Sequence, residues 1–254
     1  MKEFLLKIKD TLKDIFFPLR YTCSSCGKEV FNGQSFCEEC NNNLKFISEK
    51  KCQKCGRETA FATEECSSCY GETAVDVSRS VFVYDGPIKN VIYKFKYSFA
   101  PYLAEVLAPF LKNVYLENFF APDIITFVPM SEKAEKKRGY NQSELLADEL
   151  AKLLSTDAYS VLEKVKDTPN QAELDFKERS RNLKGAFRVT DKKIVKGKRI
   201  LLIDDVLTTG ATSREVASAL KMAGSKSVYL LTVASVSLDK SVFKGKNKVK
   251  NEEF

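Results

Sequence analysis

The stretch that decides the fold is Arg199–Thr212, which reads RILLIDDVLTTGAT. Its apolar run, Ile200–Ile203, predicts a strand buried on both faces, as in a parallel sheet covered by helices. Asp204 and Asp205 follow at the end of this strand, and we expect Ser213–Ala223 to form the next helix. Such sheets bind ligands just beyond the carboxyl ends of their strands. The sequence therefore predicts an α/β fold with a binding site at this acid pair.

The residues after the acid pair are small and rich in hydroxyl groups. They are Thr208, Thr209, Gly210, Ala211 and Thr212, called the threonine loop below. Backbone N–H groups and hydroxyls at the start of a helix hold a phosphate well. A ligand with a phosphate at one end and vicinal hydroxyls nearby, such as ribose 5-phosphate, fits both halves of the stretch. The chain has neither the G-x-G-x-x-G nor the G-x-x-x-x-G-K-[ST] motif in the required context, so a dinucleotide fold and a P-loop are not indicated.

This stretch resembles the signature of type I phosphoribosyltransferases, whose fold is a parallel sheet flanked by helices. The resemblance implies that Asp204 and Asp205 hold the ribose 2- and 3-hydroxyls and that the threonine loop cradles the 5-phosphate. It also implies phosphoribosyl pyrophosphate (PRPP) with magnesium as the usual substrate. Purine enzymes of this fold often place an aspartate three positions after the second acid. Thr208 stands there in this chain, which argues against purine recognition by that route.

Strand and helix patterns alternate through residues 75–238, which we expect to form the phosphoribosyltransferase-like domain. The further elements predicted from hydrophobic pattern are the strands Val81–Tyr84, Asp123–Val128 and Ser227–Ala234, the helices Ile88–Tyr97 and Tyr102–Leu116, and a helix capped by Asn141. The last strand would complete a parallel βαβ unit around the threonine loop.

A basic segment, Ser131–Gly139, is predicted as a loop at the same edge of the sheet as the acid pair. In a PRPP-dependent enzyme, this loop would hold pyrophosphate, together with magnesium. Its candidate cationic residues are Lys133, Lys136, Lys137 and Arg138. A solvated charge run is the alternative interpretation. The polar segment Lys166–Phe187 predicts a mobile hood over the site.

All eight cysteines lie within residues 21–74, in four C-x-x-C pairs, and the second four repeat the first at a constant offset of 29 residues. The two sets are Cys23, Cys26, Cys37 and Cys40, and Cys52, Cys55, Cys66 and Cys69. Each set offers four thiolates, enough for one closed tetrahedral zinc site. We expect two structural zinc ions in a duplicated zinc ribbon. A crossed pairing of knuckles, iron–sulfur chemistry and disulfides are the open alternatives.

Composition limits the remaining possibilities. With 254 residues, the chain can hold one α/β domain and a small accessory module. Its net charge of +7 permits polyanion binding, and the absence of histidine excludes a histidine base. No apolar run is long enough to cross a membrane, and we expect a cytoplasmic location. Residues 1–20 predict an amphipathic helix, and 239–254 predict a basic flexible tail.

From about Cys23 to Ala234 the order of these blocks resembles the ComF (ComFC, GntX) family. The distinctive blocks are RGYNQ at 138–142 and QAELDFKERSRNLKGAF at 171–187. The resemblance implies a role in DNA uptake and natural transformation, with PRPP and single-stranded DNA as ligands and DNA-processing proteins of transformation as partners. The chain departs from the commoner family pattern because it carries two complete four-cysteine sets.

Two functions fit these observations. In an enzyme that transfers a phosphoribosyl group to an unknown acceptor, Asp204, Asp205 and Arg138 would be the catalytic residues, supported by Lys133 and Lys137. Alternatively, a non-catalytic scaffold binds nucleic acid and keeps the phosphoribosyl site as a ligand sensor. Tyr97 and Tyr140 are then candidates for base stacking. A plain nucleic-acid-binding zinc ribbon is a weaker interpretation, because it leaves the acid pair unexplained.

Overall fold

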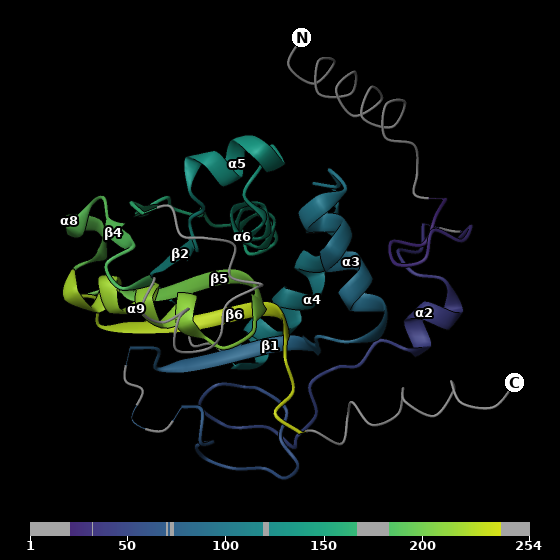
Figure 1. Cartoon of the computed structure of the whole chain (residues 1–254), viewed down its shortest axis with the longest axis horizontal. Coiled ribbons are helices and arrows are strands. Elements are labelled where there is room, and N and C mark those ends of the chain that lie inside the picture. The colour runs from purple at the N-terminus through teal and green to yellow at the C-terminus, as the bar shows by residue number, and fades with distance from the viewer. Residues whose placement is uncertain are drawn as a thin grey trace, which may run out of the picture.

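A parallel sheet of four strands, in the order β1-β6-β5-β2, forms the centre of the molecule (Figure 1). The computed structural model describes residues 21–31, 33–69, 71, 74–118, 122–166 and 183–239. The four strands are β1 (Val77–Val83), β2 (Ile124–Phe127), β5 (Arg199–Leu207) and β6 (Ser227–Ser235). A separate antiparallel pair consists of β3 (Leu162–Lys164) and β4 (Phe187–Val189). The predicted α/β class with a parallel sheet is confirmed.

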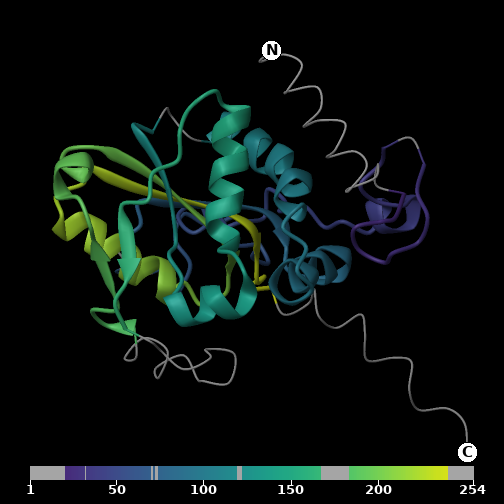
Figure 2. The same cartoon turned by 90° about the horizontal axis from the view of Figure 1, so that it is seen from above.

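Helices pack on both faces of this sheet (Figure 2). The helices are α2 (Glu38–Asn42), α3 (Gly86–Tyr97), α4 (Leu103–Asn118), α5 (Glu132–Arg138), α6 (Gln142–Leu153), α8 (Lys192–Val195) and α9 (Ala211–Met222). Successive side chains of a strand point to opposite faces. Along β5, Leu201 and Ile203 therefore join the core with α3, α4 and α6, whereas Ile200 and Leu202 join the core with α9.

The segment predicted as a basic loop is a helix, α5, so that expectation is wrong. The Ser131 side chain accepts a hydrogen bond from the Ala134 N–H and caps its start. Acidic residues occupy its first turn and basic residues its last, which suits the helix dipole. Gly139, with φ 90°, ends the helix in the left-handed conformation. The basic side chains are therefore displayed around a helix rather than along a loop.

Strand β5 also extends further than expected. It continues past the acid pair to Leu207, which pairs with Ser235 of β6. Val206 and Leu207 are buried, so their packing favours continued strand pairing. Gly210, with φ 78°, turns the chain into α9, which begins at Ala211 instead of Ser213. The acid pair therefore lies within the last part of the strand, and the threonine loop is a short turn between strand and helix.

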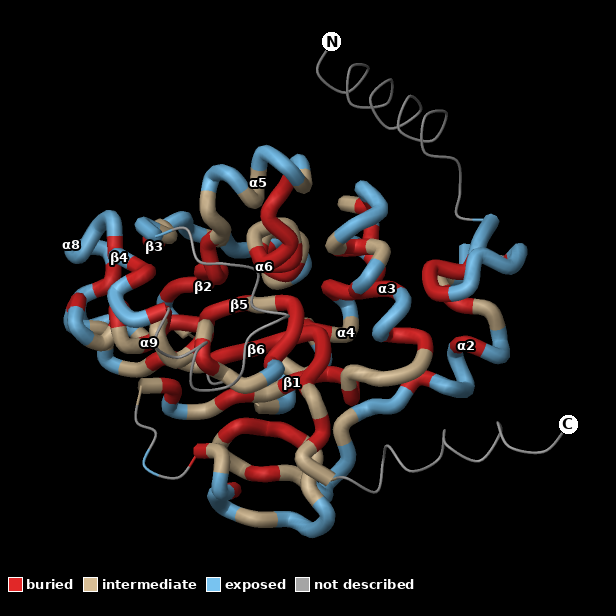
Figure 3. Tube along the Cα trace, in the orientation of Figure 1, coloured by how far each residue is buried: buried red, intermediate tan, exposed pale blue. Residues whose placement is uncertain are grey.

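The two cysteine-rich ribbons lie against different parts of the α/β fold (Figure 1). The first ribbon, residues 21–44, lies beside α3, where Lys94 Nζ donates to the Ser24 carbonyl oxygen over 3.1 Å. The second, residues 50–69, lies along β1, where the Ser78 N–H donates to the Lys54 carbonyl oxygen over 2.8 Å. Figure 3 shows that both ribbons contain buried residues. Each ribbon is thus fixed by the elements of the sheet domain.

The apolar side chains of the first ribbon become part of the main core. Val30 and Phe36 are buried, and the Phe36 ring meets the Phe110 ring of α4 at a centroid distance of 6.5 Å. Phe31 of the first ribbon and Phe61 of the second are exposed. The ribbons therefore contribute few side chains to any core of their own and depend on their cysteine clusters and on the sheet domain.

Several expectations fall outside the described residues. These are the helix over 1–20, residues 167–182 of the hood predicted over Lys166–Phe187, and the tail beyond residue 239. The end of the predicted hood is described: Leu183 and Ala186 are buried and Phe187 begins β4, so the prediction of a mobile hood is wrong for these residues. Among the helices that the structure describes, none combines the length and apolar character needed to cross a lipid bilayer.

Candidate functional site

The acid pair is held by three neighbouring groups. The Ser143 hydroxyl and the Asp205 N–H both donate to Asp204 Oδ1 over 2.9 Å. Lys96 Nζ, at the end of α3, forms an ion pair with Asp205 Oδ1 at 2.9 Å. Asn141 caps α6 by accepting from the Ser143 N–H, as its sequence position predicted, and this places Ser143 at the start of the helix. Residues from α3, α6 and β5 thus meet at one edge of the sheet.

The two carboxylates and Lys96 influence one another's charge. Burial and the negative charge of Asp205 raise the pKa of Asp204 well above its ordinary value, although Lys96, the Asp205 N–H and Ser143 oppose that shift. Burial alone would lower the pKa of Lys96, but the acid pair raises it, so Lys96 stays charged. Our sequence interpretation missed Lys96. The local sequence gave no signal for it, because Lys96 and Asp205 lie far apart along the chain and only the fold brings them together.

The threonine loop connects this acid pair to α9. Thr208 is exposed, whereas Thr209 and Gly210 are partly buried. The Thr209 hydroxyl accepts from the Ala211 N–H over 3.3 Å, and the first-turn N–H groups of α9 have no acceptor within the helix. Beneath the loop, Arg57 Nη1 of the second ribbon donates to the Thr208 carbonyl oxygen over 3.0 Å. Sequence spacing gave no signal for this contact, because the two residues lie 151 positions apart.

The cationic residues predicted to hold pyrophosphate all lie on α5, but they differ in how close they are to the acid pair. Lys133 and Lys137 are exposed on it, and Lys136 forms an exposed ion pair with Glu132 at 3.4 Å. Arg138 lies closer to the acid pair, since its Nη1 donates to Gln142 Oε1, next to the Ser143 that binds Asp204. The Arg138 guanidinium also lies over the Tyr97 ring, 5.6 Å from its centroid. Of these four residues, Arg138 is therefore the one that the described contacts link to the acid pair.

Exposed aromatic side chains gather beside Arg138. Tyr93 and Tyr97, one turn apart on α3, have ring centroids 5.0 Å apart and are 61% and 63% exposed. Phe99, 73% exposed, follows directly after the helix. We call these three residues the aromatic ledge. Tyr140, also predicted to stack bases, is buried, and its hydroxyl donates to the Phe95 carbonyl oxygen over 2.6 Å. That prediction is wrong for Tyr140, whose ring instead fills the core between α3 and α6.

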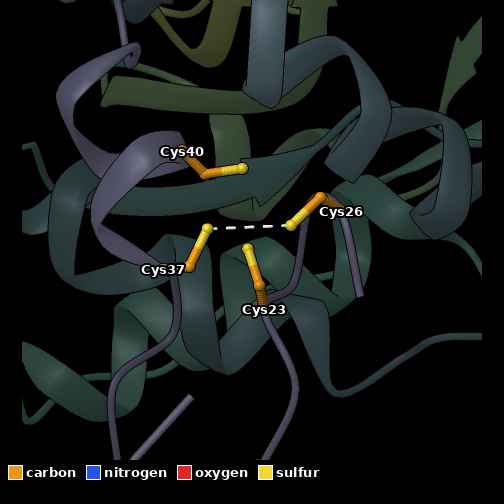
Figure 4. Close-up of side chains that lie close together, drawn as sticks. All are labelled: Cys23, Cys26, Cys37 and Cys40. Atoms are coloured by element: carbon orange, nitrogen blue, oxygen red, sulfur yellow. Dashed lines mark hydrogen bonds between the residues drawn. The ribbon is translucent and has the colours of Figure 1, made fainter. Parts of the chain in front are cut away.

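The eight cysteines form two clusters of four. Side chains of Cys23, Cys26, Cys37 and Cys40 converge on one point, with the Cys26 and Cys37 sulfurs 3.7 Å apart (Figure 4). The second cluster consists of Cys52, Cys55, Cys66 and Cys69. Within each cluster, all four sulfurs lie within 4.8 Å of one another, and all eight thiols are free. The sequential pairing is therefore the observed one, and the crossed pairing and the disulfides are excluded for these residues.

The two clusters are duplicates in their backbone contacts as well. In the first, the Cys23 N–H donates to the Lys28 carbonyl oxygen over 2.7 Å, and in the second, the Cys52 N–H donates to the Arg57 carbonyl oxygen over 3.0 Å. Although burial alone raises their pKa, backbone N–H groups lower the pKa of Cys23 to about 6 and that of Cys52 to about 7. Four converging sulfurs with a stabilised thiolate suit a structural zinc ion, which binds tetrahedral thiolate sets.

Removing the positive charge of Lys96 is expected to destabilise the fold, and more so at high pH. Lys96→Met leaves the buried Asp205 and the partly buried Asp204 without a counterion, which costs about 3 kcal/mol when both are ionised. Because the pKa of Asp204 is already raised, stability is lost as the pH rises through that pKa. Urea unfolding at pH 5.5 and 8 measures this. The control Lys89→Met removes an exposed lysine of the same helix, and an equal loss in both variants would contradict the expectation.

Comparisons with known proteins agree with this arrangement. Residues 12–70 match the model of the double zinc ribbon domain, and residues 108–250, more than half of the chain, match that of the phosphoribosyl transferase domain. Competence protein F of Haemophilus influenzae is 28% identical over 228 residues, which cover 86% of this chain and 98% of that protein.

Two further relatives support the same assignment. DNA utilization protein YhgH of Salmonella typhimurium is 32% identical, over 70% of this chain and 81% of its own length. Competence protein ComFC of Streptococcus pneumoniae is 30% identical, over 76% and 84%. The chain, in which a double zinc ribbon precedes a phosphoribosyltransferase domain, therefore belongs to the ComF family of competence and DNA utilization proteins.

Proposed function

We propose that this chain binds PRPP with magnesium at the acid pair and the threonine loop, and that it acts in the cytoplasm on DNA taken up by the cell. The observation that carries the proposal is the placement of Asp204 and Asp205 near the end of β5, with two residues between them and the threonine loop that opens α9. In ribose 5-phosphate, the vicinal hydroxyls and the phosphate lie a few ångströms apart. The carboxylates of the acid pair suit the hydroxyls, and the backbone N–H groups at the start of α9 suit the phosphate.

Each group has a role in such a complex. Asp204 and Asp205 accept hydrogen bonds from the ribose 2- and 3-hydroxyls, and the ion pair with Lys96 holds the Asp205 carboxylate in place. The threonine loop holds the 5-phosphate, and Arg138 offsets the charge of the pyrophosphate. The carboxylate oxygens of the acid pair are the hard ligands that Mg²⁺ prefers, and the ion would supply further charge neutralisation.

The chemistry that this arrangement supports is electrostatic. If an acceptor attacks ribose C1, the C1–oxygen bond breaks and pyrophosphate leaves with the electron pair. Arg138, with Lys133 and Lys137 nearby on α5, would stabilise that developing charge. If the chain binds PRPP without transferring its phosphoribosyl group, the same site acts as a ligand sensor.

Calorimetric titration of Mg-PRPP into the chain tests the proposal. We expect saturable binding of one PRPP per chain, and no heat at millimolar PRPP would refute it. An assay for pyrophosphate release with nucleobases, nucleosides and oligonucleotides as acceptors then separates the two forms of the function. Release with any acceptor establishes a transferase, and binding without release favours the sensor.

Single-stranded DNA is the second proposed ligand, and the aromatic ledge is the observation that favours it. Aromatic side chains stack on bases of any sequence, and Arg138 adds a positive charge beside them. DNA-processing proteins of transformation are the proposed protein partners, by analogy with the competence proteins that this chain resembles. Lys96, the residue before Tyr97, forms an ion pair with Asp205, so α3 links the ledge to the acid pair.

Loss of the ledge is expected to weaken binding of an oligothymidylate about tenfold or more, because stacking contributes about 1–3 kcal/mol per base. The variant is Tyr93→Ala/Tyr97→Ala, and fluorescence anisotropy at several salt concentrations is the measurement. Tyr159→Ala removes a partly exposed tyrosine elsewhere and should bind as the wild type does. Equal affinity of all three proteins would exclude the ledge as the DNA site.

A further inference from the structure

Arg57 joins the second cysteine cluster to the threonine loop. It follows Cys55 by two positions, is only 5% exposed, and donates from Nη1 to the Thr208 carbonyl oxygen over 3.0 Å. A small cavity between the second ribbon and the start of α9 is lined by Cys55, Arg57 and Gly210 among others. One buried side chain therefore spans the distance between the thiol cluster and the loop that follows the acid pair.

The backbone that carries Arg57 is closely confined. Gly56 has φ +67°, and a Cβ at that position would lie 2.4 Å from the Ser78 carbonyl oxygen of β1. The Arg57 carbonyl oxygen accepts from the Cys52 N–H over 3.0 Å and so closes the turn around the first two cysteines of the cluster. Strand β1 and the cluster thus fix the point from which the guanidinium reaches the loop.

This hydrogen bond acts on the loop through the geometry of the peptide bond. In a trans peptide the C=O and the following N–H point in opposite directions. Holding the Thr208 oxygen toward the ribbon therefore turns the Thr209 N–H away from it. A charged donor on the carbonyl also polarises the peptide and makes its N–H a better donor.

The charge of Arg57 adds to this effect. Among the ion pairs between described residues, none includes Arg57, and its Nε is buried without a hydrogen-bond partner. The positive charge therefore lies close behind the threonine loop, where it favours an anion on the other side. Arg57 and Cys55 line the same small cavity, so the guanidinium also lies near the thiol cluster.

We propose that Arg57 is a positioning residue through which the metal-bound second ribbon presets the threonine loop for a phosphate-bearing ligand. The inference rests on the proposed binding of PRPP. A second ribbon without metal releases the Arg57 backbone, and the loop then loses both the hydrogen bond and the adjacent charge. The first ribbon contacts α3 instead, so its metal acts on folding and not on the loop.

Three variants test the role of Arg57. Arg57→Met is expected to raise the Kd of Mg-PRPP about tenfold, the effect of losing one hydrogen bond from a charged donor. Arg57→Lys keeps the charge and should lie between this variant and the wild type. Arg79→Met is the matched control, because Arg79 also binds a carbonyl of the second ribbon, Gln53 O at 2.7 Å, without a described contact to the loop. It should bind within twofold of the wild type.

Two readouts distinguish positioning from folding. The zinc content of Arg57→Met should equal that of the wild type, and the ¹⁵N shift of the Thr209 amide should change in Arg57→Met but not in Arg79→Met. If the wild-type chain does not bind Mg-PRPP, the proposed function is refuted. The shift of the Thr209 amide then still tests the contact between Arg57 and the threonine loop. Wild-type affinity and an unchanged Thr209 shift in Arg57→Met, or in Arg57→Lys if the first variant does not fold, overturn the inference.

Discussion

Replacing both members of the acid pair, as in Asp204→Asn/Asp205→Asn, is expected to weaken the binding of Mg-PRPP at least a hundredfold. Each carboxylate would accept a hydrogen bond from a ribose hydroxyl, and a hydrogen bond to a charged group contributes about 1.5–3 kcal/mol. The substitution also leaves Lys96 without its ion pair and removes the hard oxygen ligands suited to magnesium. Calorimetry at pH 8, with magnesium held constant, measures the loss.

The same experiment has an internal control for folding. Burial and Asp205 raise the pKa of Asp204 above its reference value of 3.8. When the pKa of a carboxyl group is higher in the folded than in the unfolded chain, the fold loses stability as the pH rises through that pKa. Asparagine does not titrate, so Asp204→Asn should have a higher Tm than the wild type at pH 8, and the difference should shrink toward pH 5. If Asp204→Asn binds Mg-PRPP more weakly although its fold is more stable, Asp204 contacts the ligand. Retained affinity for Mg-PRPP in the double variant would contradict the proposed binding site.

Withdrawal of zinc is expected to lower the Tm of the chain by about 10 °C or more. Metal binding supplies much of the folding free energy of small zinc modules, and a loss of a few kcal/mol shifts the Tm of a domain of this size by roughly that amount. The first ribbon also shares side chains with the main core through the Phe36–Phe110 contact, so its unfolding exposes part of that core. Thermal melts with and without a chelator provide the measurement.

Single-cluster variants sharpen this prediction. Cys40→Ser and Cys69→Ser each remove one ligand, and each protein should retain one of the two zinc ions expected in the wild type. Elemental analysis should also find zinc instead of iron, which decides the remaining alternative of an iron–sulfur cluster. Far fewer than two zinc ions per wild-type chain would contradict the duplicated site.

The sequence predicted those parts of the molecule whose signals are local. A continuous apolar run gave the central strand, and the helix cap at Asn141 followed from one side chain and its neighbours. The 29-residue repeat of cysteines predicted two equivalent clusters, because ligand spacing within a knuckle is a short-range property. These features depend little on the rest of the fold.

Contacts between distant segments could not be predicted in the same way. The segment around Lys136 has the acidic start and basic end of a helix, but its charge density led to a loop prediction. Tyr140 was predicted as a candidate for base stacking, which requires an exposed ring, yet packing between α3 and α6 buries it. Lys96 and Arg57 reach the site from segments far away in sequence, and only the folded chain brings them together.

A crystal structure of the chain soaked or grown with Mg-PRPP tests the central claim most directly. We expect the 5-phosphate against the threonine loop at the start of α9 and the ribose hydroxyls within hydrogen-bond distance of Asp204 and Asp205. Arg138 should face the pyrophosphate. PRPP bound at any other place, or a ribose that touches neither carboxylate, would contradict the account.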